Sequence, residues 1–124
     1  MLFCNVFGAL FRESSLNSNL APNLILNTGD ITTKDATVFN CNWSNYKYLI
    51  ITGGNYDNII ESHFIPASYM SDTNSGKRVI LYIGSTNCII EVWKSGNNAV
   101  VIKLTGTGAE TSHFRANIYG IIPA

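Results

Sequence analysis

From residue 23 onward the chain is a series of short runs rich in β-branched and aromatic residues, separated by Gly, Asn, Ser and Asp. Most runs recur about ten residues apart, which is typical of an antiparallel β-sandwich and not of a parallel α/β sheet. The eight expected strands span residues 23–27, 37–41, 47–52, 59–65, 77–83, 87–94, 99–105 and 112–121. We therefore predict that residues 23–124 form an all-β domain, an antiparallel, jelly-roll-like β-sandwich of about eight strands.

The length of 124 residues and the mass of 13.6 kDa fit one domain. A chain of this size buries roughly 65% of the surface that it exposes when unfolded, so its core needs neither disulfides nor a metal. Cys4, Cys41 and Cys88 make an odd number without a C-x-x-C pair, which predicts three free thiols. His63 and His113 lack closely spaced partner ligands, so we expect no metal and no cofactor.

Charge is low and balanced, because eight Lys and Arg face eight Asp and Glu and only 13% of residues are charged. The basic residues are scattered, whereas nucleic acids and anionic membranes require clustered Lys and Arg. The polarity comes instead from 15 Asn, 11 Ser and 10 Thr. We therefore predict no binding to nucleic acid, and ligand recognition through hydrogen bonds and aromatic faces.

Residues 1–22 form a distinct apolar segment, in which hydrophobic side chains between residues 2 and 11 recur at three- and four-residue spacing. This is the stripe of a short amphipathic helix, although Gly8 weakens a helix by about 1 kcal/mol relative to alanine. No basic residue precedes the run and Arg12 ends it, so we expect neither a signal peptide nor membrane insertion. The segment is expected to pack on the domain itself or on copies of itself in an oligomer. The predicted contact residues are Phe3, Phe7 and Leu10.

The strands expected between residues 77 and 105 form an antiparallel meander, because short turns join them. The first of these strands is apolar on both faces, which predicts a second burial partner. That partner is the N-terminal segment or another subunit, and Ile80 and Tyr82 are the predicted contacts. In the next strand, alternation places Cys88, Ile90 and Val92 on one face, and Cys88 is expected to be a small core residue.

No catalytic motif stands out, so we predict no catalytic residues and no enzymatic activity. Glu61 and His63 share one face of a strand, which is the arrangement of an acid/base pair. No positioned nucleophile or metal set accompanies them. A solvated strand edge is therefore the preferred interpretation.

Aromatic residues beside Asn, Asp and Ser are typical of a sugar-binding surface, where a ring stacks on a pyranose and amides bond its hydroxyls. The segment 53–58 is expected to be a loop, since its glycines permit positive φ. For the two tryptophans, packing at the end of the sandwich or over the sheet is the alternative role. The predicted ligand-binding residues are Asn55, Tyr56, Asp57, Trp43 and Trp93.

Four short motifs carry a resemblance to a known family: L-I-L-N-T-G at 24–29, N-Y-K-Y-L-I-I at 45–51, F-I-P at 64–66 and I-Y-G-I at 118–121. Together they resemble the C-terminal tip domains of bacteriophage tail-fibre and receptor-binding proteins. The resemblance covers roughly residues 24–122. It implies an antiparallel sandwich in the virion, usually a homotrimer, that binds a host-surface glycan or protein and catalyses nothing.

Tail fibres carry a long shaft before the tip, whereas about twenty residues precede the resemblance here. The sequence is therefore interpreted as a tip fragment or as a small, separately encoded virion protein. Two alternative functions stay open. One is a monomeric, lectin-like carbohydrate-binding module, secreted or at the cell surface, and the other is a purely structural virion protein.

Overall fold

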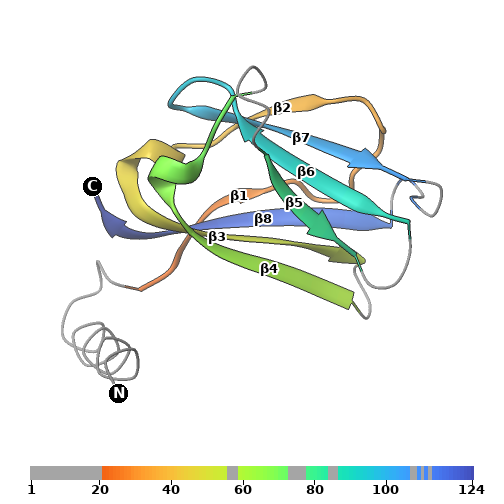
Figure 1. The fold of residues 1–124 in the computed structure, drawn as a ribbon, viewed down its shortest axis with the longest axis horizontal. Helices are drawn as coiled ribbons and strands as arrows, with labels where there is room; N and C mark the ends of the chain where they lie inside the picture. Colours follow the sequence, from red (N-terminus) through yellow and green to blue (C-terminus); the bar gives the residue numbers. More distant parts are fainter. Residues whose placement is uncertain are drawn as a thin grey trace.

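The computed structural model is a sandwich of two four-stranded antiparallel sheets (Figure 1), and it describes residues 21–55, 59–72, 78–83, 87–106, 109, 111 and 113–124. The first sheet has the order β1-β8-β3-β4 and the second β2-β7-β6-β5. The strands are β1 (Asn23–Asn27), β2 (Thr37–Asn40), β3 (Tyr46–Asn55), β4 (Ile59–Pro66), β5 (Val79–Tyr82), β6 (Ile89–Lys94), β7 (Ala99–Thr105) and β8 (Phe114–Pro123). The predicted antiparallel β-sandwich is confirmed.

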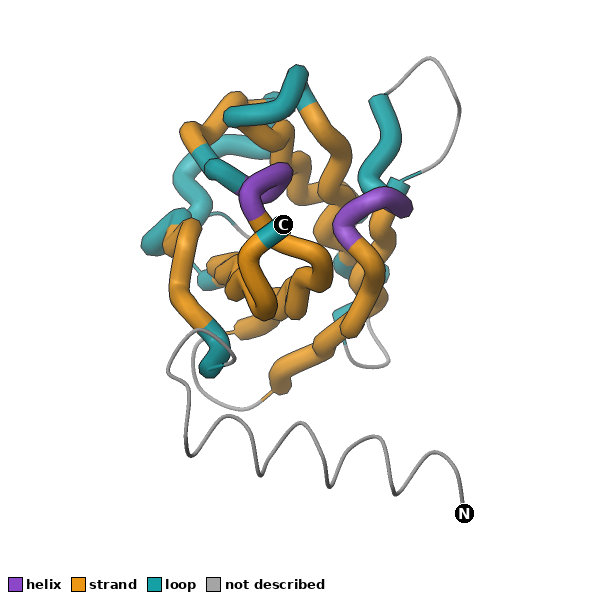
Figure 2. The backbone as a smooth tube through the Cα atoms, turned by 90° about the vertical axis from the view of Figure 1, so that its left-hand side faces the viewer, coloured by secondary structure: helices purple, strands orange, loops and turns teal. Residues whose placement is uncertain are grey.

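Two 3-10 turns, η2 (Trp43–Asn45) and η3 (Ala67–Tyr69), lie at one end of the sandwich. Figure 2 shows both turns at the same end as the C-terminus. The backbone N–H of Ala124 donates to the carbonyl of Asn45 at 2.8 Å, which ties the C-terminus to this end.

The chain pairs its first strand with its last and its second with its seventh. β3–β4 and β5–β6 are hairpins within the two separate sheets. Because β4 ends one sheet and β5, the next strand in sequence, ends the other, the two edges lie beside each other along one open side of the sandwich. This side carries the candidate site described below.

The core lies between the sheets and follows the alternation of the strands. In β6 the residues predicted to share a face with Cys88 are buried, and in β7 the same face is buried at Val100, Ile102 and Leu104. The least exposed side chains of the molecule are Leu49, Ile51, Leu81, Ile83, Ile90, Leu104, Ile118, Val92, Val100 and Cys88. Full burial of one such side chain contributes about 1.5–3 kcal/mol, so the two inner faces dominate the stability of the fold.

The prediction that segment 53–58 is a loop is wrong in its first half, because β3 continues through Gly53 and Gly54 to Asn55. A Cβ at Gly53 would lie 2.9 Å from Cδ1 of Leu81 and 3.0 Å from Cδ1 of Ile90 in the facing sheet. The missing side chain at Gly53 thus makes room for Leu81 and Ile90 of the facing sheet, and it does not serve a positive φ.

Other strand limits also differ from the prediction. The strand expected at 77–83 is shorter, and the one expected at 112–121 extends to Pro123, which pairs with Tyr46. Of the N-terminal segment 1–22, only residues 21 and 22 are described. The predicted contacts at Phe3, Phe7 and Leu10 therefore lie outside the described residues.

Cys41 and Cys88 are free, buried thiols, and Cys4 is outside the described residues. Burial raises the pKa of Cys41 to about 11, against a smaller lowering by a hydrogen bond from the backbone of Trp43. Burial also raises the pKa of Cys88. Both thiols are consequently stabilised in the protonated form by the fold.

We expect the free energy of unfolding to fall as the pH rises from about 9 to about 11. Below pH 9 the Cys41 thiol is protonated in both states, whereas above it the unfolded thiol ionises first and the unfolded state is favoured. At about pH 10.5 the loss in free energy of unfolding that is due to Cys41 is about 2 kcal/mol. Urea unfolding at about pH 8.5 and at about pH 10.5 measures this loss. The variant Cys41→Ala is the control, and an equal loss in both proteins would contradict the assignment.

Candidate functional site

A groove of about 520 Å³ lies on the open side of the sandwich, between the edge strands β4 and β5 and beside the turn η3. Its volume falls in the range of small-ligand sites in proteins, about 300–1,000 Å³. The residues that line it include His63, Ser68, Tyr69, Ser71, Arg78 and Ile80. The groove therefore combines an aromatic ring, hydroxyl groups and nitrogen donors in one depression.

Tyr69 is held out from the surface by the local fold. Pro66 enters the turn in an extended conformation, and the N–H of Met70 donates to the carbonyl of Ala67 at 3.0 Å. Ala67, the first residue of the turn, and Met70, which follows the turn, are both buried. With these two residues anchored in the core, the Tyr69 side chain stays 69% exposed.

His63 joins the two sheets across the groove. Its Nε2–H donates to the backbone carbonyl of Ile80 at 2.9 Å, because a carbonyl oxygen only accepts. In the tautomer that carries its hydrogen on Nε2, Nδ1 is available as an acceptor. Glu61 shares this face of β4, as predicted, and is partly buried, while the His63 side chain is exposed at the sheet edge.

Arg78 forms the opposite wall and connects the groove to the outer face of the second sheet. Its Nη1 bonds Oε1 of Glu91 at 3.1 Å, and its guanidinium lies 4.7 Å from the ring centroid of Trp93. A planar guanidinium on an aromatic face covers the ring and fixes its own orientation. Trp93 is only 7% exposed as a result.

Trp43 lies in the core at the end of the sandwich and is 6% exposed. Its Nε1–H is directed at the carbonyls of Gly96 and Ala99, each at 3.2 Å. Trp43 thereby links the turn η2 to the chain between β6 and β7. Both tryptophans have packing partners in this structure, and their role in ligand binding stays a prediction.

Of the three other predicted ligand-binding residues, only Asn55 is described, and it lies away from the groove. Asn55 ends β3 at the far end of the β3–β4 hairpin, roughly 23 Å along the strand from the level of η3. Tyr56 and Asp57 lie outside the described residues. The groove residues Tyr69 and Arg78 were not predicted from the sequence, although they flank a stretch rich in Ser, Asp and Asn.

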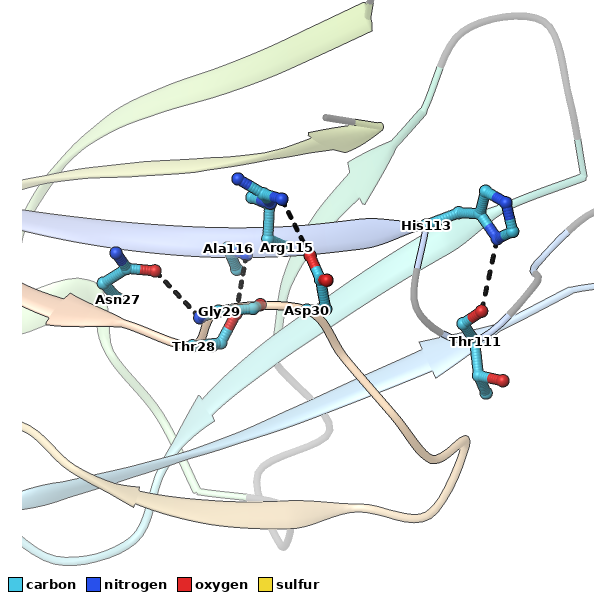
Figure 3. Close-up of polar contacts among 8 residues, drawn as sticks. All are labelled: Asn27, Thr28, Gly29, Asp30, Thr111, His113, Arg115 and Ala116. Carbon is cyan, nitrogen blue, oxygen red and sulfur yellow. Dashed lines mark hydrogen bonds and ion pairs between the residues drawn. The ribbon is translucent and has the colours of Figure 1, made fainter. Parts of the chain in front are cut away.

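A second polar cluster holds the chain that leaves β1 against β8 (Figure 3). The hydroxyl of Thr28 accepts from the N–H of Ala116 at 2.9 Å, and Arg115 bonds Asp30 at 2.8 Å. His113 donates to a carbonyl within its own turn. These contacts join neighbouring strand segments, so we assign them to the fold and not to a binding site.

Within the described part of the chain, no group of three or more His, Cys, Asp or Glu side chains is placed to hold a metal ion. Across the same residues, no helix has the length and apolar character needed to cross a membrane. The groove is therefore the candidate site with the clearest geometry.

No protein-family model, no curated protein and no solved structure matches this chain.

Proposed function

We propose that this domain is a glycan-binding module at the tip of a phage tail fibre, which attaches the particle to a host surface without a catalytic step. The observation that carries the proposal is the groove between β4 and β5, in which an exposed tyrosine ring stands beside several hydrogen-bonding groups. The low, balanced charge of the chain suits a neutral, hydroxyl-rich ligand.

A sugar ring has an apolar C–H face and a rim of hydroxyls, and the groove offers a partner for each. The Tyr69 ring provides an exposed flat surface for the C–H face. The hydroxyls of Ser68 and Ser71 and the Nδ1 of His63 lie around the same depression and can exchange hydrogen bonds with the rim. The guanidinium of Arg78 is held in place by Glu91, so it enters binding already oriented.

The virion location and the homotrimer rest on the resemblance of residues 24–122 to tail-fibre tips. Tyr82 supports an oligomer contact on β5, because this large side chain is 62% exposed on an edge strand. The same groove also serves the alternative of a monomeric, lectin-like module that is secreted or at the cell surface. The mass in solution separates the two, since a trimer of 13.6 kDa chains differs threefold from a monomer.

The variant Tyr69→Ala is expected to lose at least about tenfold in glycan affinity, because it removes the stacking surface of the groove. A glycan array followed by calorimetric titration of the strongest hit measures this loss. Val38→Ala is the control, since Val38 is 60% exposed on β2 and does not line the groove. Unchanged affinity in Tyr69→Ala, with binding intact in the wild type, would show that the site is elsewhere.

A further inference from the structure

The outer face of the first sheet carries a continuous apolar row across all four strands. Leu24 on β1 pairs with Tyr119 on β8, Tyr119 with Ile50 on β3, and Ile50 with Phe64 on β4. The next row towards the C-terminus repeats this character, since Ile121 pairs with Tyr48. We call these six residues the apolar face: Leu24, Tyr48, Ile50, Phe64, Tyr119 and Ile121.

The apolar face is a local feature and not a property of the whole sheet. On its other side the next cross-strand row is entirely polar: Asn27, Asn117, Thr52 and Ser62. Outer faces of antiparallel sheets that meet water are expected to be polar in every row. Leu24 and Phe64 are nevertheless 50% and 55% exposed, and the Tyr48 and Phe64 rings stack with centroids 5.5 Å apart. The face is thus uncharged, and Leu24 and Phe64 leave a large part of their apolar surface exposed.

We propose that residues 2–11 of the same chain cover the apolar face. The described chain begins at residue 21, and Leu24, three residues later, is itself part of the face. Residues 2–11 contain no charged side chain and carry a hydrophobic stripe at helical spacing. An amphipathic helix needs an apolar surface for its stripe, and this surface lies beside the point where the segment joins the sandwich.

The dimensions of segment and surface agree. A ten-residue helix is roughly 15 Å long, and four paired strands span roughly 14 Å from the first to the last. The eleven residues 12–22 reach up to roughly 36 Å when extended, which is enough to return the segment across the sheet. A tethered segment has a local concentration in the millimolar range, which favours the same chain over a second copy.

Hydrogen exchange measured by mass spectrometry on the full chain tests the proposal. Amides of residues 2–11 are expected to exchange at least about tenfold faster in the double variant Leu24→Asp/Phe64→Asp than in the wild type. Leu24 and Phe64 are half exposed, so their substitution leaves the core between the sheets in place. Slow exchange of the amides of β3 and β8 in the same experiment shows that the sandwich is intact. Val38→Asp/Ile60→Asp is the control, because it adds the same charge at exposed positions outside the apolar face and is expected to leave the segment protected.

Protection of residues 2–11 that is lost only in the Leu24/Phe64 variant and does not change on dilution supports docking within the chain. An unprotected segment in the wild type, or protection that survives in that variant, overturns the proposal. Protection that disappears on dilution also overturns it, because the segment then covers a second copy. The proposal is independent of glycan binding, since the groove contains no residue of the apolar face.

Discussion

The variant Gly106→Ala is expected to lose about 4 kcal/mol or more of its free energy of unfolding, a large part of the 5–15 kcal/mol of a typical domain. Gly106 has φ +116°, a region that L side chains rarely adopt. A Cβ at this position would collide with the backbone carbonyl of Asn87, and backbone cannot move aside as a side-chain tip does. The strained φ costs about 1–3 kcal/mol and the forced shift about as much again.

Gly96→Ala is the matched control for this variant. Gly96 also has a positive φ, +71°, but a Cβ there would meet no heavy atom within 4 Å. It therefore isolates the cost of the backbone conformation, about 1 kcal/mol. Urea unfolding followed by tryptophan fluorescence compares the two variants. Equal midpoints for Gly106→Ala and Gly96→Ala would contradict the packing of Gly106 against Asn87.

The variant Trp43→Ala is expected to lose about 3–5 kcal/mol, because it removes the largest side chain of the core and leaves a cavity at the end of the sandwich. It also leaves the carbonyls of Gly96 and Ala99 without the indole N–H. Urea unfolding followed by circular dichroism measures the loss without relying on the fluorescence of the residue that is replaced.

Trp43→Phe separates the two contributions. It keeps an aromatic ring in the core and removes only the N–H donor together with part of the volume, so we expect about 1–2 kcal/mol. If Trp43→Ala and Trp43→Phe were equally stable, the ring would not fill the end of the sandwich as the structure places it. If both variants were as stable as the wild type, the burial of the Trp43 side chain would be contradicted.

The fold class could be predicted because it depends on patterns that are local in the sequence. Alternation with period two sorts the side chains of a strand onto two faces without any knowledge of its neighbours, and the residues that share the inner face of β6 were predicted in this way. The limits of β1 and β7 were also predicted correctly. The hairpin between β6 and β7 follows from the short turn between them.

The remaining features depend on contacts between distant parts of the chain. The sequence predicts a loop at Gly53, because only the folded structure brings Leu81 of the other sheet close to this position. The pairing of β1 with β8 joins residues ninety or more positions apart, on which alternation has no bearing. Sequence patterns also do not reveal which strands form the edges of the sheets.

The candidate site also depends on contacts between distant parts of the chain. The groove exists because β4 and β5 end different sheets on the same side of the sandwich, and His63 bridges them through the carbonyl of Ile80. The sequence reasoning placed the ligand near Asn55 instead, because that stretch combines an aromatic residue with Gly, Asn and Asp. Exposure of Tyr69 follows from the burial of Ala67 and Met70, which composition alone does not indicate.

The most direct test of the central claim is an amide chemical-shift titration of the full-length protein with the glycan that binds most strongly on the array. The account predicts that the largest shifts cluster around the groove, at His63, Tyr69 and Arg78. Shifts that centre on residues 55–58, or saturation of the glycan signal without shifts at the groove, would contradict it.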